Sequence, residues 1–162
     1  YQHTRVKADS NHLLGARGAS DDERPFGLNQ DIELTFMGWE IAPESYYNQI
    51  MELKNHYGNP VIYLTENGCA YPDKIEKDGK IHDKKRIEYY KKYLSAVKRA
   101  IDDGANIKGY MTWSLMDNFE WALGFEKRFG LIHIDFDTLK RTPKNSYFFY
   151  KDLISNNGFV PE

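Results

Sequence analysis

The stretch VIYLTENGCAY, residues 61–71, decides how the rest of the chain is interpreted. Its first five residues, 61–65, are apolar or β-branched, which is typical of a strand buried on both faces of a sheet. Glu66 stands where this run stops, and Asn67 and Gly68, which favour turns, follow it. We therefore expect a buried strand with a carboxylate at its carboxyl end.

Three other segments carry apolar residues at helical spacing. The first begins at Pro43, which suits the first turn of a helix, and ends at Gly58. The second can be capped by Asp83 and ends at Gly104, and the third follows Pro143. The apolar stripes of the three helices are Tyr46, Ile50, Leu53 and Tyr57; Ile87, Tyr90, Leu94, Val97 and Ile101; and Tyr147, Tyr150 and Ile154.

A second strand is expected at residues 107–113, so helices and strands alternate along the chain. This alternation is typical of parallel strands joined by helical crossovers. The helix-to-strand links, 58–60 and 104–106, are short, whereas the strand-to-helix links, 66–82 and 114–142, are long. A (β/α)8 barrel, whose active site is built from the loops after the strands, has this asymmetry. A doubly wound open sheet is the alternative, although the chain shows no Gly-rich phosphate loop.

The length of the chain limits how much of a barrel it can form. Such a barrel takes at least about 200 residues and eight strands. This chain has 162 residues, two clear strands and a third candidate ending near Tyr1. The predicted fold is therefore α/β, the C-terminal portion of a (β/α)8 TIM barrel, from about strand 6 or 7 to strand 8. We expect residues 1–35 to be mostly loop, residues 36–162 to form the last βα units, and residues 1–162 to belong to one catalytic domain.

Composition excludes several classes of protein. The formal charge is −2, which gives no electrostatic case for binding nucleic acid or an anionic membrane. Cys69 is the single cysteine, so we expect neither a disulfide framework nor a metal site, and no cofactor. Aromatic residues make up 15% of the chain, which fits either a tyrosine-rich core or a pocket walled by rings.

The loop after the second strand is rich in groups that suit a sugar. It reads SLMDNFEWALGFEKRFG and places Asp117, Asn118, Glu120 and Trp121 within five residues. Carboxylates and an amide suit the hydroxyls of a pyranose ring, and indoles suit its apolar face. Core packing is the alternative for Trp113 and Trp121, and a salt bridge or a helix cap is the alternative for Glu66. At the end of a barrel strand, however, a carboxylate is often catalytic.

Several longer motifs point to one family. YLTENG, together with GYMTWSLMDNFEWALGFEKRFGLIHIDF, resembles family 1 glycoside hydrolases, the β-glucosidase and β-galactosidase group. The resemblance extends through MGWEIAPESYY, DKKRIEYYKKYL and RTPKNSYFFYKDLI, so it covers essentially the whole chain from Phe36 onward. It implies a (β/α)8 barrel and retaining hydrolysis of β-glycosides. We expect the terminal sugar to be unphosphorylated, because Glu120 would repel a phosphate and Phe129 has no hydroxyl to offer it.

The resemblance also assigns roles to individual residues. Glu66 matches the catalytic nucleophile, and Tyr1 resembles the tyrosine whose hydroxyl contacts that nucleophile. The implied substrate-binding residues are Trp113, a platform under the sugar; Glu120 and Trp121, which bind its 4- and 6-hydroxyls; Phe129, beside the 6-position; and Trp39, near the aglycone entrance. Asn67 and Gly68 are expected to shape the turn rather than to touch substrate.

One part of the family's machinery is missing from the sequence. The acid/base glutamate of the family lies in an Asn-Glu-Pro segment, and no such segment occurs here. We therefore expect the N-terminal portion of the same barrel to be a partner that supplies it. We also expect a cytoplasmic location. The alternatives are a non-catalytic carbohydrate-binding or scaffold protein of the same fold, and an unrelated small α/β domain.

Overall fold

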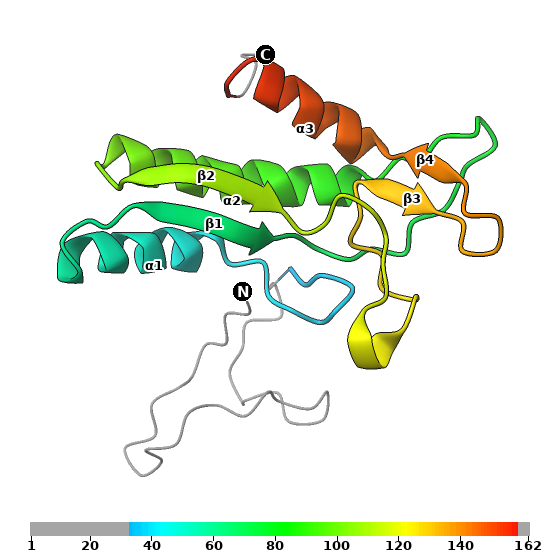
Figure 1. The fold of residues 1–162 in the computed structure, drawn as a ribbon, viewed down its shortest axis with the longest axis horizontal. Coiled ribbons are helices and arrows are strands. Elements are labelled where there is room, and N and C mark those ends of the chain that lie inside the picture. The colour runs from blue at the N-terminus through cyan, green and yellow to red at the C-terminus, as the bar shows by residue number, and fades with distance from the viewer. Residues whose placement is uncertain (1–32, 159–162) are drawn as a thin grey trace, which may run out of the picture.

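The computed structural model describes residues 33–158 (Figure 1). Helices and strands alternate in its first half, as predicted. In chain order the elements are α1 (Pro43–His56), β1 (Ile62–Asn67), α2 (Lys84–Asp102), β2 (Ile107–Thr112), the short 3-10 helix η1 (Trp121–Leu123), β3 (Ile132–Ile134), β4 (Arg141–Pro143) and α3 (Asn145–Ser155).

Strands β1 and β2 pair in parallel, as the alternation predicts, and lie side by side along α1 and α2 (Figure 1). Leu64 pairs with Tyr110 and Asn67 pairs with Thr112, so three steps along β1 correspond to two steps along β2. This irregularity is a β-bulge, which redirects the side chains that follow it. Glu66 lies inside the bulge, within β1 rather than beyond its end.

A tyrosine-rich core fills the space between the helices and the sheet. The ring of Tyr89 stacks on that of Tyr93 with 4.3 Å between centroids, and Tyr46 meets Tyr93 edge to face at 5.3 Å. Cys69, at 0% exposure, belongs to the same core. The high aromatic content of the sequence therefore serves the core to a large extent.

The predicted helical stripes are correct except at their C-terminal ends. In α1, Tyr46 and Ile50 are buried, but Leu53 is 37% exposed. In α2 the buried face is centred on Tyr90 and Leu94, whereas Ile101 is 46% exposed. Leu53 and Ile101 therefore lie outside the core.

The expectation of a strand buried on both faces is not met by the described residues. Four residues are between 37% and 57% exposed, and we call the surface that they form the open face: Val61, Tyr63, Met111 and Trp113. Tyr63 and Met111 lie on the same side of the sheet, because a Cβ added to Gly109 would meet both side chains. Within residues 33–158, the helices cover only the opposite side.

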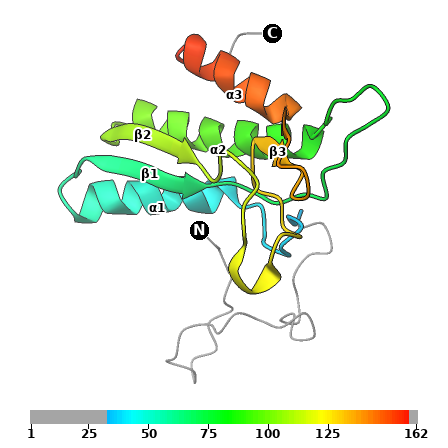
Figure 2. The same ribbon diagram turned by 45° about the vertical axis from the view of Figure 1, so that its right-hand side comes forward.

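The long link after β2 contains structure that the sequence analysis expected to be loop. It forms η1 and the antiparallel hairpin of β3 and β4, in which His133 pairs with Thr142. Both views place this hairpin and the yellow loop carrying η1 at the end of the sheet towards which β1 and β2 point (Figures 1 and 2). The elaborated loops are therefore gathered at the carboxyl ends of the parallel strands.

We expect the isolated 162-residue chain to self-associate through the open face, because apolar side chains and unpaired strand edges seek cover. Met111→Lys should weaken this association, since burying an ammonium between two copies is unfavourable. Tyr57→Lys is the matched control, because Tyr57 is 70% exposed at the end of α1, away from that face. Gel filtration with light scattering at several concentrations measures the effect. A monomeric, cooperatively folding wild-type chain would contradict the expectation.

Candidate active site

Glu66, within β1, and Trp113, directly after β2, lie at the same end of the sheet. The backbone N–H of Trp113 donates to the carbonyl oxygen of Asn67, at 2.9 Å, directly beyond the pairing of Asn67 with Thr112. The Glu66 side chain is exposed and Trp113 is 37% exposed, so both are accessible from solvent. This end of the sheet therefore presents an exposed carboxylate and a partly exposed indole.

Gly68 allows the two strands to approach each other closely at this point. A Cβ placed on Gly68 would lie 1.7 Å from the carbonyl oxygen of Trp113 and 2.8 Å from its carbonyl carbon. Neither backbone atom can move aside without breaking the contact between Trp113 and Asn67. The glycine is thus required by close approach rather than by turn geometry alone.

Phe129 and Trp39 join the same region. The backbone N–H of Ser114 donates to the carbonyl oxygen of Phe129, at 3.3 Å, which places Phe129 next to Trp113 in space. The ring centroid of Phe129 lies 6.1 Å from that of Trp39. Phe129 is only 3% exposed, whereas Trp39 is half-buried. The structure therefore brings Trp113, Phe129 and Trp39 close to one another, and their roles in binding sugar remain predictions.

Glu120 and Trp121 lie further out, on the loop that carries η1. Glu120 is half-buried, and its backbone N–H donates to the carbonyl oxygen of Gly124 at 2.7 Å. Trp121 is 81% exposed. Among residues 33–158, no hydrogen bond or ion pair joins either side chain to Glu66. Their predicted roles remain predictions, and Tyr1 lies outside the described residues.

Asp117, which the loop composition suggested for sugar contact, is instead part of a buried ionic network. Its carboxylate accepts bonds from Lys144 Nζ and from Arg128, each at 2.8 Å. It also accepts the backbone N–H of Gly130 at 2.9 Å and that of Ile134 at 3.3 Å. Asp117 therefore organises the loop that bears Glu120 and Trp121 and is not free to bind a hydroxyl.

The network continues to the start of α2. It contains three cations and three carboxylates, and we call it the ionic cluster: Arg86, Arg128, Lys144, Asp73, Asp83 and Asp117. Arg86 is 0% exposed and donates to Asp73 at 2.7 and 3.0 Å and to Asp83 at 2.5 Å. Lys144, also 0% exposed, donates to Asp73 at 2.5 Å.

Asp83 precedes α2 as predicted, but it does not cap the helix through its side chain. Its carboxylate accepts bonds from Arg86, and from the backbone N–H of Ser146 at 2.9 Å, so it links α2 to α3. The roles of Arg86 and Lys144 were not predicted from the sequence. Arg86 lies four residues before Tyr90, on the buried side of α2, and a cation at a position that faces the core could have indicated a buried ion pair.

Electrostatics keep Asp117 ionised inside the protein. Burial by itself would raise its pKa, but the charge of Lys144 and the bonds from Lys144 and Arg128 outweigh that effect. The pKa of Asp117 is consequently held below its ordinary value. The opposite result at Cys69, whose pKa burial raises, shows how strongly the same interior opposes a charge that lacks such partners.

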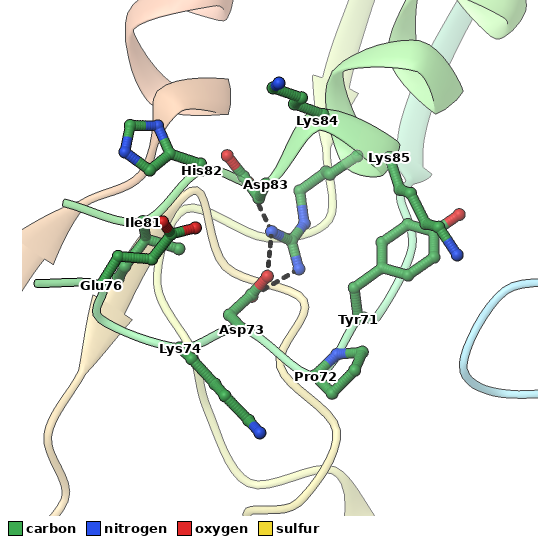
Figure 3. A pocket seen from close by; sticks show the side chains of 11 residues that line it. Tyr71, Pro72, Asp73, Lys74, Glu76, Ile81, His82, Asp83, Lys84 and Lys85 are labelled. Carbon is green, nitrogen blue, oxygen red and sulfur yellow. Dashed lines mark hydrogen bonds and ion pairs between the residues drawn. The ribbon is translucent and has the colours of Figure 1, made fainter.

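A cavity of about 380 Å³ lies beside the ionic cluster, between the β1–α2 loop and the start of α2 (Figure 3). Asp73, Asp83 and Arg86 are among the residues that line it. Figure 3 shows the side chain of Lys74 extending away from Asp73 and Asp83. None of the predicted site residues lines it.

Within residues 33–158, no group of three or more His, Cys, Asp or Glu side chains is arranged to hold a metal ion. No helix in that range has the length and apolarity needed to cross a membrane.

The chain belongs to glycosyl hydrolase family 1, whose family profile matches residues 1–159. It is 53% identical over 130 residues to β-glucosidase A of Acetivibrio thermocellus, a match that covers 80% of this chain and 29% of that protein. It is 49% identical over 125 residues to a 6-phospho-β-galactosidase of Staphylococcus epidermidis, covering 76% of this chain and 27% of that one.

A solved structure gives the same result. The β-glucosidase from Thermotoga maritima in complex with castanospermine superposes with a TM-score of 0.80 at 43% identity, covering 83% of this chain and 30% of that one. The described residues thus form part of a (β/α)8 barrel, as predicted, and the alternative of a doubly wound sheet is rejected. The chain spans just under a third of the length of these relatives.

Stability can be tested in a complex that supplies the rest of the barrel. We define the reconstituted complex as the full 162-residue chain co-expressed with the part of the Acetivibrio thermocellus β-glucosidase A that this chain does not match. Asp117→Asn should lower its free energy of unfolding by about 3 kcal/mol at pH 7, because Lys144 and Arg128 lose a buried countercharge. Urea unfolding at fixed protein concentration measures this.

The same variant should alter the pH dependence of stability. Because the folded-state pKa of Asp117 is lowered, its contribution is fully present above the unfolded pKa of about 3.9 and is lost as the pH falls through the folded value. The difference between wild type and variant should therefore be constant above about pH 5 and shrink below pH 4. Asp135→Asn is the control, since Asp135 accepts its bonds from backbone N–H groups of an exposed turn. Equal losses in both variants would contradict the assignment.

Proposed function

We propose that this chain forms the nucleophile-bearing part of a retaining β-glycosidase, similar to a β-glucosidase, that releases terminal unphosphorylated β-D-glycosyl residues. The observation that carries the proposal is the position of Glu66: an exposed carboxylate at the carboxyl end of a barrel strand, at the same end of the sheet as Trp113, in a chain of glycosyl hydrolase family 1. In (β/α)8 barrels, catalytic groups occupy this end of the strands.

The chemistry needs two carboxyl groups about 5–5.5 Å apart across the glycosidic bond. A carboxylate oxygen of Glu66 attacks the anomeric carbon, the bond to the leaving oxygen breaks, and that oxygen takes a proton from the second group. Water then attacks the anomeric carbon, gives a proton to the second group, and releases Glu66. Both steps invert the anomeric centre, so the β configuration is retained.

The second carboxyl group is supplied by a partner in this proposal. Asp117, Asp83 and Asp73 are occupied by the cations of the ionic cluster, so none of them is available as the acid. Glu120 lies on the loop that we assign to the sugar hydroxyls. The acid/base glutamate then comes from the N-terminal portion of the barrel, which also covers the open face of β1 and β2.

The sugar itself is held by the aromatics and carboxylate gathered at this end of the sheet. We assign Trp113 as the platform beneath the ring and Glu120 with Trp121 as the contacts for its 4- and 6-hydroxyls. Phe129 lies beside the 6-position and is braced by Trp39. An indole face and hydroxyl-binding carboxylate suit a neutral pyranose, and the relatives named β-glucosidase agree with this class.

A phosphorylated substrate is the second candidate, because the 6-phospho-β-galactosidase of Staphylococcus epidermidis is 49% identical to this chain. A phosphate dianion at the 6-position would meet the carboxylate of Glu120, which repels it. Phe129 has no hydroxyl to offer the phosphate, and Arg128 is already bound to Asp117. The charge and the donors of this loop therefore favour a neutral 6-hydroxyl.

We expect a 2-deoxy-2-fluoro-β-glucoside with a good leaving group to label Glu66 covalently in the reconstituted complex, because the fluorine slows breakdown of the glycosyl-enzyme. Peptide mapping by mass spectrometry locates the label. Glu66→Gln should abolish labelling, whereas Glu120→Gln should weaken binding and leave the site of labelling unchanged. A label on any other carboxylate would refute the nucleophile assignment.

The chain without its partner should show negligible turnover of cellobiose. General acid catalysis contributes about 10²–10⁴-fold, and we assign no carboxyl group among residues 33–158 to that role. Adding the partner should restore turnover, measured as glucose released. Activity of the purified 162-residue chain alone would show that a second carboxylate within this sequence is the acid.

We expect the reconstituted complex to hydrolyse nitrophenyl β-glucoside faster than the same glucoside carrying a 6-phosphate, because Glu120 repels the dianion. Comparison of kcat/KM for the two substrates measures this preference. Glu120→Gln should narrow the gap by removing the repulsion. Faster turnover of the phosphorylated substrate by the wild type would overturn the assignment.

A further inference from the structure

We propose that Asn67 is a positioning residue that fixes the carboxylate of Glu66 relative to the indole of Trp113. The inference rests on the proposed function, in which Glu66 is the nucleophile and Trp113 supports the sugar. It goes beyond it, because it gives a role to a residue that the sequence analysis expected only to shape a turn.

The first observation is that both ends of the Asn67 amide are held. Asn67 is 3% exposed. Its Oδ1 accepts the hydroxyl of Tyr110 on β2 at 2.6 Å, and its Nδ2 donates to the hydroxyl of Tyr89 on α2 at 3.2 Å. A buried amide needs such partners, and two of them from different elements fix the plane of the amide group.

The second observation is that these two tyrosines are themselves fixed. The ring of Tyr89 stacks on Tyr93 at 4.3 Å. The backbone of Tyr110 pairs with that of Leu64 in the parallel sheet. The orientation of Asn67 is therefore set by strand β2 and helix α2, and not by the exposed loops.

The third observation is the effect of the bulge on Glu66. Ile62 is buried and Leu64 is half-buried on the helix-covered side, so regular alternation would turn Glu66 towards the core. The extra residue between Leu64 and Asn67 breaks that alternation. Asn67 takes the inward place opposite Thr112, and Glu66 is left exposed. The contacts that hold the Asn67 side chain towards the helices therefore also keep the Glu66 side chain exposed.

The fourth observation connects the carboxylate to the sugar platform. The backbone carbonyl of Asn67 accepts the N–H of Trp113 at 2.9 Å. The residue that follows the nucleophile thus holds the start of the loop that carries the indole. One side chain, locked by two hydroxyls, sets the distance between two groups that must act on the same sugar.

The test compares three variants of the reconstituted complex. Tyr110→Phe removes only the 2.6 Å bond to Asn67, and Asn67→Ala removes both amide bonds but keeps the carbonyl that holds Trp113. Tyr150→Phe is the matched control, because it also removes one hydroxyl bond from a half-buried tyrosine, to the backbone of Tyr110 rather than to Asn67. Each variant is treated with the fluoroglucoside that traps Glu66.

The experiment measures two quantities. One is the rate constant for covalent labelling per active site that can be labelled, and the other is the dissociation constant of the reagent before it reacts. A misplacement of about 1 Å can cost about 100-fold in rate. We expect about 100-fold slower labelling for Asn67→Ala and about 10-fold for Tyr110→Phe, with the dissociation constant changed less than about threefold in each. Tyr150→Phe should label at the wild-type rate.

Several results would overturn the proposal. Asn67→Ala labelling at the wild-type rate would do so, as would equal losses in Tyr110→Phe and Tyr150→Phe. A merely structural role would lower the number of active sites that can be labelled and the unfolding midpoint while leaving the rate per site unchanged, and that result also counts against it. Rates that fall as expected support it.

Failure of the proposed function can be told apart from failure of this inference. If the wild-type complex is labelled on a carboxylate other than Glu66, the proposed function is wrong. Crystal structures of the wild-type and Asn67→Ala complexes then decide the inference on geometry alone. A shift of Glu66 relative to Trp113 in the variant supports it, and an unchanged arrangement of the two side chains refutes it.

Discussion

The rest of the described structure depends on the complete burial of one guanidinium group, that of Arg86. It binds Asp73 in the loop after β1, Asp83 at the start of α2, and the backbone carbonyl of Arg128 in the loop after β2. A charge in such a place is tolerated only when its partners are all present, and removal of one costs about 3–5 kcal/mol. The cluster therefore fixes the relative positions of the two long loops, and through Asp117 it fixes the loop of Glu120 and Trp121.

This arrangement separates two tasks within the same loops. In the buried parts of these loops, each charged side chain is paired with another. The outer parts contain exposed aromatic and polar side chains that are available to a ligand. Preorganised sites need such support, because side chains that act on a substrate must be held by others that do not. Asp117 and Glu120 lie three residues apart and illustrate the division: one is surrounded by four donors, and the other is half-exposed.

Sequence reasoning predicted the elements that depend on local periodicity and missed those that depend on distant partners. Helix α2 and the strand before Glu66 were predictable because their apolar spacing is visible within a short window. The pairing of Lys144 with Asp73 joins residues 71 positions apart, and no local pattern reports it. Composition assigned Asp117 to the sugar because it lies beside Glu120, but its burial is decided by Lys144 on the far side of the hairpin. A bulge is likewise a property of two strands together, so the inward turn of Asn67 could not be inferred from β1 alone.

Because Cys69 is buried, the reactivity of its thiol reports how often the protein opens. The thiol is the single one in the sequence, it is 0% exposed, and the backbone carbonyl of the same residue accepts the Nε–H of Arg86 at 3.3 Å. Burial raises the pKa of the thiol, so very little of the reactive thiolate exists in the closed state. A thiol reagent therefore reacts only when the chain opens around Arg86, and the rate of that reaction measures how often the two loops separate from the sheet.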